Sequence, residues 1–293
     1  MRVLVLGAAG FIGRHVVEGL CAAGHEVVAA IQPGTATSAV PICARRIVIV
    51  DPVADPGGLS ELLQSEFSTV VNAAGRTTGT VTELVAANAL LVGALLESLA
   101  SLPKRKRPRL VHFGSAAEYA PPENRRPISP DHPLAPIGPY AVSKVCGSTL
   151  VTDALRSEAI TGTVLRLFNP VGPGSPETGL PGAAIRRISR AVDANEPRVA
   201  FGPLDDERDF IDVRDAAGAA VLACSHRGTL PAVLNVGTGL AQPGRLIVDA
   251  LVGASGWDGI VDCTGSGSPR SRVPWQAADI GETQKTLGWQ PCR

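Results

Sequence analysis

The chain has 293 residues, which is enough for one large domain or for one domain with a smaller appended lobe. Its 27 basic and 27 acidic side chains give a formal charge of zero, which predicts no general attraction to nucleic acid or to an anionic membrane. The sequence suggests no membrane span and no signal peptide, and six cysteines without Cys-x-x-Cys spacing indicate reduced thiols in a cytoplasmic protein.

The chain opens with a strand, a glycine-rich turn and a helix. Residues 2–6 form a continuous apolar run that is typical of a buried parallel strand, and a helix-like segment ends near Ala23. Glycines between them allow the backbone to approach a pyrophosphate, while the helix N-terminus offers unpaired N–H groups and a positive dipole end. A purely structural turn is the alternative. The predicted dinucleotide-binding residues of this turn are Gly7, Gly10, Phe11, Ile12 and Gly13.

A second strand is expected over residues 26–31. In folds that bind NAD, an acidic residue near the end of this strand usually holds the ribose 2′-hydroxyl. Here Gln32 occupies that place, and no carboxylate is present. Arg14 could pair with a 2′-phosphate, although a solvated helix position is an equal alternative. We therefore predict an NAD(P) site, leave the coenzyme choice open and lean slightly toward NADP(H).

Strands and helices continue to alternate along the chain. Asp51, at the end of a strand over 46–50, is a candidate to contact the adenine edge, with a strand-end turn as the alternative. A strand over 68–72 is followed by small residues that would let a coenzyme lie close, and Asn88 lies on a helix expected over 80–100. The basic run at 104–109 is interpreted as a solvated loop. The further predicted coenzyme contacts are Ala73, Ala74, Gly75 and Asn88.

Two later segments carry acid–base chemistry. A strand that begins near residue 110 ends in Ser115, and a helix follows with Tyr140 and Lys144 four residues apart on one face. A free phenol has a pKa near ~10, and a nearby ammonium favours the phenolate and lowers that pKa. The spacing makes Tyr140 and Lys144 candidates for acid–base catalysis, with an ordinary amphipathic helix face as the alternative. Ser115 ends its strand at the sheet edge where parallel sheets bind ligands.

Together, the glycine turn, Ser115 and Tyr140-x-x-x-Lys144 resemble the extended short-chain dehydrogenase/reductase family. Within that family, these motifs most resemble those of the sugar-nucleotide epimerases, dehydratases and ketoreductases. Further similar segments follow in the family's order, so that the match covers nearly the whole chain. These segments are residues 165–174, 208–215, 235–239 and 287–291.

The resemblance implies a role for each matching residue. Tyr140 would be the catalytic acid or base, Lys144 would hold the nicotinamide ribose, and Ser115 would hydrogen-bond the reacting sugar oxygen. Asn169 would position the sugar-phosphate region, and Arg208 would pair with the substrate diphosphate. The residues alone leave an alternative for Arg208, namely an ion pair with Asp205 or Asp209. Ala116, beside the serine, is the remaining predicted substrate contact.

The predicted fold is α/β, with a doubly wound, mostly parallel Rossmann-type sheet and a smaller C-terminal substrate lobe. Residues 1–171, with 206–239 returning, would bind NAD(P). Residues 172–205 and 240–293 would form the lobe, and 265–269 are expected to form a mobile loop.

The predicted reaction is reduction of a nucleotide-linked 4-keto-6-deoxyhexose. The 4,6-dehydratases of this family carry an Asp-Glu pair after the serine, whereas this chain has Ala116 and Ala117, so dehydration is disfavoured. The alternatives are 4-epimerisation with retained NAD, an aldehyde or flavonoid-type ketoreductase, and a non-catalytic dinucleotide sensor. The histidines lack metal-ligand spacing and none is tied by motif to Ser115, which disfavours a hydrolase. The expected partners are a nucleotide sugar and a second copy of the chain in a homodimer.

Overall fold

The computed structural model describes residues 1–263 and 273–293, and its main layer is a sheet of seven parallel strands. The predicted loop at 265–269 lies outside the described residues. The strand order is β10-β6-β5-β4-β1-β2-β3, so the chain starts in the middle, winds outward to β3, and then returns and winds the other way. The strands are β1 (Arg2–Leu6), β2 (Glu26–Ile31), β3 (Arg46–Ile49), β4 (Thr69–Asn72), β5 (Arg109–Ser115), β6 (Gly162–Leu167) and β10 (Val233–Val236).

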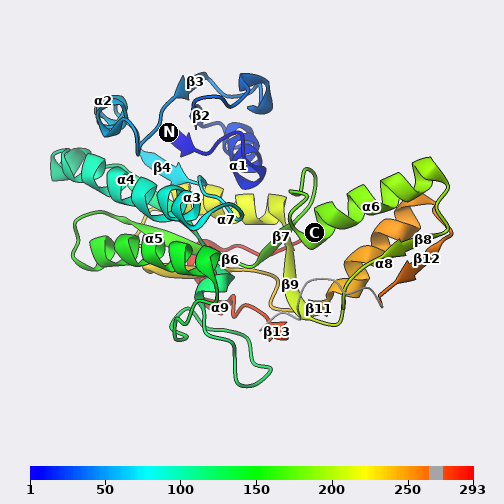
Figure 1. Ribbon diagram of the computed structural model, residues 1–293. Coiled ribbons are helices and arrows are strands. Elements are labelled where there is room, and N and C mark those ends of the chain that lie inside the picture. The colour runs from blue at the N-terminus through cyan, green and yellow to red at the C-terminus, as the bar shows by residue number, and fades with distance from the viewer. Residues whose placement is uncertain (264–272) are drawn as a thin grey trace.

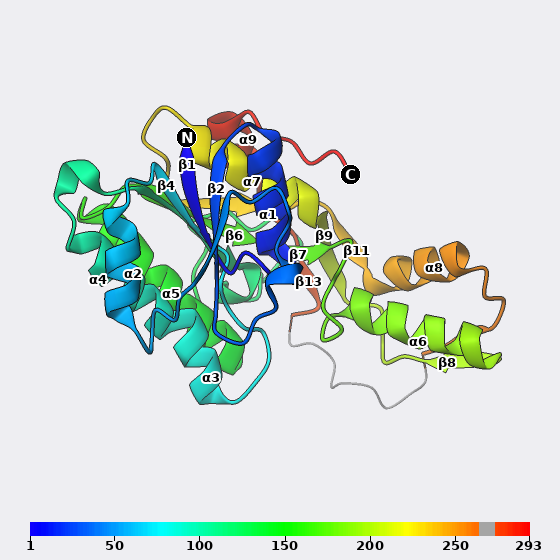
Figure 2. The ribbon, with the colours of Figure 1, turned by 90° about the horizontal axis from the view of Figure 1, so that it is seen from above.

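Helices cover both faces of this sheet (Figures 1 and 2). One face carries α1 (Phe11–Ala22) and α7 (Val213–Ser225), and the other carries α2 (Pro56–Gln64), α4 (Leu91–Ala100) and α5 (Pro139–Arg156). Because both faces are covered, the strands are apolar along most of their length, and each fully buried Val or Leu contributes roughly 1.5–3 kcal/mol. This architecture confirms the predicted doubly wound α/β class.

A smaller lobe projects from one end of the sheet (Figure 1). Its apolar core lies between two helices and a two-stranded sheet and includes Ile188, Phe201 and Val248. A four-stranded sheet formed by β7, β9, β11 and β13 is separate from the main sheet. The elements are β7 (Asn169–Val171), α6 (Leu180–Ala194), β8 (Arg198–Ala200), β9 (Glu207–Asp212), β11 (Ala241–Pro243), α8 (Gly244–Ser255), β12 (Ile260–Asp262) and β13 (Trp275–Gln276).

The C-terminal segment lies elsewhere than in the predicted lobe. Helix α9 (Gly281–Leu287) packs on β10 and α7, and Leu287 and Trp289 join the core of the main domain. The indole nitrogen of Trp289 donates to the main-chain oxygen of Asp215 at 3.0 Å. These contacts place the last part of the range 240–293 on the coenzyme-domain side of the molecule.

The helical stretch Val81–Ala100 is apolar and 20 residues long, which by length and composition is enough to cross a membrane. The expectation that the sequence contains no apolar run of this length was therefore wrong. In the structure this stretch consists of α3 (Val81–Val85), a π-helical turn (Ala86–Leu90) and α4. Leu84, Leu91, Leu95 and Leu99 are buried, and α4 packs against α2 and α5. Its hydropathy is that of a helix packed on a sheet.

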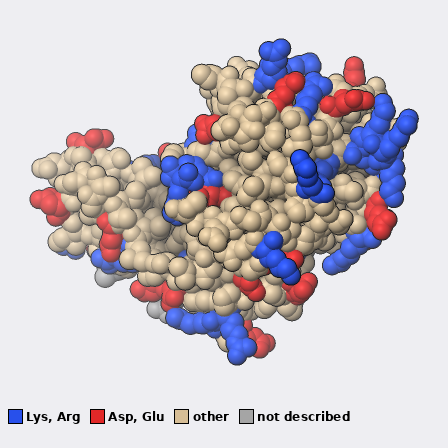
Figure 3. Space-filling view, turned by 180° about the vertical axis from the view of Figure 1, so that it is seen from behind, with Lys and Arg blue, Asp and Glu red and all other residues tan. Residues whose placement is uncertain are grey.

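The basic run at 104–109 contains arginines that bind main-chain oxygens. The Arg107 guanidinium donates to the carbonyls of Ala100, Leu102 and Ala159, and Arg109 donates to those of Ala223, His226 and Gly228. These two arginines therefore satisfy the ends of α4 and α7, as cations at helix C-termini do. On the face drawn in Figure 3, basic and acidic side chains are interspersed over a largely uncharged surface.

Helix α5 approaches the π-helical turn closely at Gly147. A Cβ atom there would lie 2.1 Å from the main-chain oxygen of Asn88. Only glycine permits this approach without a shift of the helix. Gly93 in α4 is the matched contrast, because a Cβ there would have no neighbour within 4 Å.

We predict that Gly147→Ala lowers the free energy of unfolding by about 1–3 kcal/mol, since the added methyl group must push α5 from the turn. Gly93→Ala should leave stability unchanged or raise it by up to about 1 kcal/mol, because it restores helix propensity in open space. Urea denaturation of both variants measures the difference. Equal stabilities of the two variants would contradict the tight approach.

Candidate active site

The glycine turn joins β1 to α1 at the carboxyl edge of the sheet. Gly7 has φ +75°, and a Cβ on it would lie 2.7 Å from the backbone of Ala74. A Cβ on Gly13 would lie 2.0 Å from the Gly7 oxygen, so both glycines are required by close backbone packing. Gly10 is the N-cap of α1 and provides no side-chain cap, which leaves the first N–H groups of the helix free to bind an anion.

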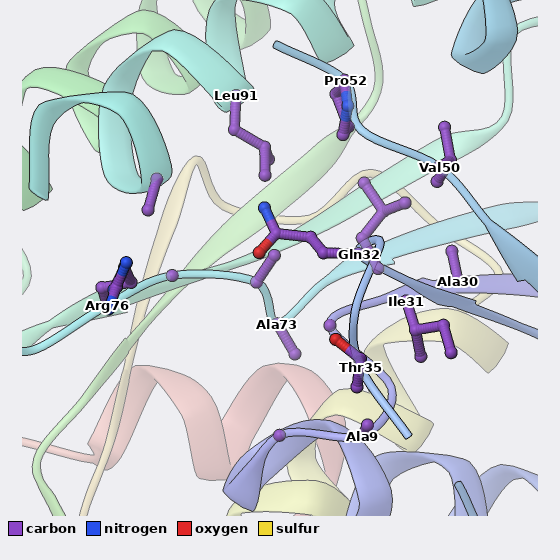
Figure 4. Close-up of a pocket in the computed structure, with 16 residues that line it drawn as sticks. Ala9, Ala30, Ile31, Gln32, Thr35, Val50, Pro52, Ala73, Arg76 and Leu91 are labelled. Carbon is purple, nitrogen blue, oxygen red and sulfur yellow. The ribbon is translucent and has the colours of Figure 1, made fainter. Parts of the chain in front are cut away.

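A pocket next to this turn is lined by residues from the ends of β1, β2 and β4 (Figure 4). Gln32 and Thr35 line it on the β2 side, and Ala73, Ala74 and Gly75 line it on the β4 side. These small residues follow β4 as the sequence predicted. The pocket has the position at which a doubly wound sheet binds the adenosine half of a dinucleotide.

Three polar residues near this pocket form contacts within the protein that the sequence did not predict. Arg14 donates to the main-chain oxygen of Pro173 at 2.7 Å, so its guanidinium is directed to the substrate-lobe loop instead of a 2′-phosphate. One carboxylate oxygen of Asp51 accepts from the N–H groups of Val53 and Ala54, both at 3.1 Å, and Asp51 does not line the pocket. These bonds form the turn at the end of the strand, which was the alternative for Asp51.

Asn88 also differs from its prediction as a coenzyme contact. Its side chain is buried in the π-helical turn, and its oxygen accepts from the Arg76 N–H at 3.0 Å. Its amide nitrogen donates to the Arg76 main-chain oxygen at 2.8 Å and to the Ser143 hydroxyl at 3.0 Å. Asn88 therefore supports the loop after β4 and joins it to α5, while Ala87 and Leu91 line the pocket.

The second part of the site is a cleft of about 710 Å³ between the sheet edge and the smaller lobe. It contains Ser115, Tyr140, Asn169 and Arg208, which come from β5, α5, β7 and β9. Phe11 and Ile12 line it as well, while Ala116 lines an adjoining pocket with the same four polar residues. Gly10, Ala73 and Gly75 line both the cleft and the adenosine-side pocket, so the two spaces meet at the glycine turn.

The pKa of the Tyr140 phenol lies above its ordinary value. Burial is the main cause, a hydrogen bond with the Ser115 hydroxyl opposes it, and the Glu118 carboxylate adds to the rise. The prediction that the Lys144 ammonium brings this pKa down is therefore wrong for the protein without ligand, because burial dominates. Tyr140 is a protonated phenol at neutral pH and is ready to donate.

Lys144 is almost completely buried beneath the site. Its ammonium donates to the main-chain oxygen of Phe113 at 2.6 Å. Burial lowers the pKa of Lys144, and the Glu118 carboxylate partly restores it. Nearby, His112 is also buried and its Nδ1 lies 3.1 Å from the amide nitrogen of Asn72. Burial and the Lys144 charge hold the pKa of His112 well below its usual range, so His112 is neutral.

Arg208 lies in the cleft with a partner that differs from the predicted ones. Its guanidinium donates to the Glu207 main-chain oxygen at 2.8 Å and lies 3.8 Å from the Asp206 carboxylate. Asp209 instead binds Thr238, Gly239 and Ala278 through their N–H groups. The Asn169 amide nitrogen donates to the Asp209 main-chain oxygen at 3.1 Å, and Asn169 lines the cleft.

Two residues that lie at or beside the site, Gln276 and Glu118, were not identified from the sequence. Gln276 lies in the pocket beside Ser115 and donates to the Ala116 main-chain oxygen at 2.9 Å, a contact across 160 positions without a local pattern. Glu118 is completely buried and forms a capping box with Ser115. The pattern Ser-x-x-Glu is a known helix-start signature and could have revealed that pairing.

Comparisons with known proteins agree with this geometry. Residues 3–237 match the NAD dependent epimerase/dehydratase family. The chain is 35% identical over 298 residues to the dTDP-6-deoxy-L-talose 4-dehydrogenase (NAD(P)(+)) of Kitasatospora kifunensis, covering 100% of this chain and 91% of that one. It is 29% identical over 257 residues to the GDP-6-deoxy-D-mannose reductase of Pseudomonas aeruginosa, covering 85% and 79%.

A solved structure of a protein that binds a nucleotide sugar and NAD has the same fold. MoeE5 in complex with UDP-glucose and NAD superimposes with a TM-score of 0.83 at 28% identity, covering 100% of this chain and 94% of that one. The chain belongs to the NAD-dependent epimerase/dehydratase family. It is an NAD(P)-dependent enzyme of the short-chain dehydrogenase/reductase type, as the sequence predicted.

We predict that Gly10→Val weakens NAD binding at least ~100-fold, because the isopropyl group would enter the junction where the pyrophosphate must cross. A Cβ on Gly10 meets only the Gly7 oxygen, at 3.2 Å, so the variant should remain folded. Isothermal titration calorimetry measures the affinity, and circular dichroism checks the fold. Unchanged affinity in a folded variant would remove the glycine turn from the coenzyme site.

Proposed function

We propose that this enzyme interconverts a ketone and an alcohol at C4 of a nucleotide-linked 6-deoxyhexose, with reduction as the physiological direction. The observation that carries the proposal is the cleft in which Ser115, Tyr140 and Arg208 line one space that opens onto the coenzyme pocket. The relatives named as a 4-dehydrogenase and as a reductase of 6-deoxysugars support the same chemistry in its two directions.

Tyr140 is the proton donor in this proposal. The bound NAD(P)H supplies a hydride to the carbonyl carbon when the coenzyme is present. Tyr140 gives its phenolic proton to the carbonyl oxygen, so that the ketone becomes a secondary alcohol, and the phenolate then regains a proton from solvent. Its raised pKa keeps the proton in place before reaction. Ser115 donates a hydrogen bond to the same substrate oxygen and stabilises the charge that develops there.

Arg208 and Asn169 would bind the diphosphate side of the substrate. The Arg208 guanidinium is mostly buried, lines the cleft and lies 3.8 Å from the Asp206 carboxylate. Its planar fork of donors suits the oxygens of a diphosphate, with which it can form short, charge-assisted bonds. A nucleotide-linked sugar meets this requirement, and a free sugar or a flavonoid does not.

The coenzyme proposal changes with the structure. The lean toward NADP(H) rested in part on Arg14, which binds Pro173 instead. Gln32 and Thr35 leave the pocket without a carboxylate to repel a 2′-phosphate, and Gln32 can hydrogen-bond a 2′-hydroxyl. We infer that both NAD(H) and NADP(H) are accepted, as the name of the Kitasatospora relative states for that enzyme.

We also propose a homodimer. Four large apolar side chains on α3, the π-helical turn and α5 are exposed by 41–59%, although these elements pack on one another. They are Val81, Leu90, Val142 and Leu150. A second copy is the occupant that would cover these side chains, because exposed apolar side chains favour association. Sedimentation at twice 30.2 kDa supports the dimer, and a single-chain mass in the wild type excludes it.

The assay combines enzyme, excess NADH or NADPH and a nucleotide-linked 4-keto-6-deoxyhexose, and it follows the reduced-nicotinamide absorbance. We predict consumption of many coenzyme equivalents per enzyme. Tyr140→Phe should lower kcat by at least ~10³-fold, because it removes the proton, and Ser115→Ala should cost about 10²–10³-fold, as for one positioned donor.

The control is Leu222→Ala, which trims an exposed side chain of α7 away from the cleft and should keep wild-type turnover. Sugar turnover without net coenzyme consumption would identify an epimerase with retained NAD. Coenzyme binding without turnover of any such sugar would indicate the non-catalytic sensor.

A further inference from the structure

A layer of buried polar side chains lies between the main sheet and α5. Asn72 on β4 is paired with His112 on β5, and two positions further along the strands Arg166 on β6 is paired with Asn235 on β10. All four are at most 4% exposed. This face of a parallel sheet is normally apolar, so the layer calls for a reason beyond packing.

Glu118 lies at the centre of this layer and is fully buried. Its Oε1 accepts two hydrogen bonds, from the Ser115 N–H at 2.7 Å and from the Ser148 hydroxyl at 2.8 Å. Its Oε2 accepts from Nε of Arg166 at 2.8 Å. The absence of a side chain on Gly114 makes room for it, since a Cβ there would lie 2.9 Å from Oε1.

The two serines that share Oε1 belong to the two halves of the catalytic machinery. Ser115 is the predicted substrate-oxygen donor on the sheet side. On α5, Ser148 lies one turn beyond Lys144, and Lys144 lies one turn beyond Tyr140. The three residues are four positions apart and therefore share one face of the helix. A single carboxylate oxygen therefore connects the serine loop to the helix that carries the proton donor.

Arg166 fixes the other oxygen of Glu118 and is itself held from three sides. Its guanidinium contacts Glu118, donates to the Pro130 main-chain oxygen at 3.3 Å and lies 4.7 Å over the Tyr119 ring. Tyr119 in turn donates to the Asn235 side chain at 2.6 Å. An ordinary capping box forms at the protein surface and needs no arginine partner. Burying the Glu118 carboxylate and the Arg166 guanidinium costs free energy unless both are fully hydrogen-bonded.

We propose that the buried Glu118–Arg166 pair positions Ser115 relative to Tyr140. In this proposal the Glu118 carboxylate also supplies the negative charge that acts on Tyr140 and Lys144. The inference rests on the catalytic roles proposed above for Ser115 and Tyr140. Neither Glu118 nor Arg166 touches the cleft in the part of the chain that the structure describes, so both act through other residues.

The negative charge of Glu118 changes the pKa values of Tyr140 and Lys144 in a known direction. Among the described residues, the charged group that acts on both Tyr140 and Lys144 is the Glu118 carboxylate, which is paired with Arg166 from β6. His112 from β5 lies near Lys144 and is neutral. The carboxylate raises the pKa of both Tyr140 and Lys144. Glu118→Gln removes the negative charge and keeps a hydrogen-bonding oxygen, so the pKa of Tyr140 should fall. Because reduction needs the protonated phenol, the alkaline limb of the kcat profile should move to lower pH.

The test is a double-mutant cycle of Glu118→Gln and Ser115→Ala, with kcat and KM measured over pH. We expect Glu118→Gln to lower kcat about tenfold in the wild-type background, with KM within about twofold, because a displaced donor affects the transition state more than binding. In the Ser115→Ala background the same change should cost less than about twofold, since no serine hydroxyl remains to be positioned. The alkaline shift should persist in both backgrounds.

A matched control separates positioning from general destabilisation. Asp215→Asn also neutralises a buried carboxylate that pairs with an arginine, Arg293 at 2.8 Å, but Asp215 lines neither the cleft nor the pockets that adjoin it. We expect this variant to lose stability and to keep the wild-type kcat and pH profile.

A direct readout of Tyr140 needs no substrate. The chain has only two tyrosines, so tyrosine labelled with carbon-13 at Cζ gives two signals that Tyr140→Phe assigns. In Glu118→Gln, the Tyr140 signal should begin to titrate at a lower pH than in the wild type. An unchanged titration and wild-type kcat would overturn the proposal, as would equal rate losses in the two serine backgrounds. Retained turnover in Tyr140→Phe would instead refute the proposed function.

Discussion

All chemistry in this molecule depends on the parallel pairing of the seven strands. In such a sheet every carboxyl end faces the same edge, so the loops that follow β1, β4, β5 and β6 must converge there. The glycine turn, the Ala73–Gly75 segment and Ser115 come together for this reason alone. A register shift of one residue in any of these strands would turn its apolar side chains to the wrong face, and the fully buried core prevents it.

The edge becomes a reactive site because α5 is held tightly against the sheet. Gly147 allows the helix to approach the π-helical turn, Asn88 bonds both that turn and Ser143, and Glu118 bonds Ser115 and Ser148. Burial at this edge raises the pKa of the Tyr140 phenol and lowers that of the Lys144 ammonium, so Tyr140 is protonated at neutral pH.

The fold could be predicted from the sequence because its signals are local. Apolar runs such as residues 2–6, a glycine turn and alternating helical segments define a doubly wound sheet without knowledge of any long-range contact. The residues around Ser115, Tyr140 and Lys144 were also visible, since their spacing and order carry the family resemblance. Residue types at strand ends, by contrast, do not say where a side chain points.

The roles of Arg14, Asp51 and Asn88 were not predictable for that reason. Arg14 binds Pro173, which lies 159 positions away, and the bonds of Asn88 depend on a π-helical turn that no pattern announces. The pKa of Tyr140 was misjudged because the spacing to Lys144 is visible in the sequence whereas the extent of burial is not. Glu118 has a visible capping-box signature, but its partner Arg166 is 48 positions away and only the folded sheet brings them together.

The central claim, that hydride passes between a released nicotinamide coenzyme and C4 of a nucleotide-linked sugar, can be tested by isotope transfer. NADH or NADPH carrying deuterium at the transferable position of the nicotinamide is mixed with enzyme and a nucleotide-linked 4-keto-6-deoxyhexose. We predict one deuterium at C4 of each product sugar, seen by mass spectrometry and by loss of the H4 proton signal. Product sugar without deuterium at C4 would contradict it.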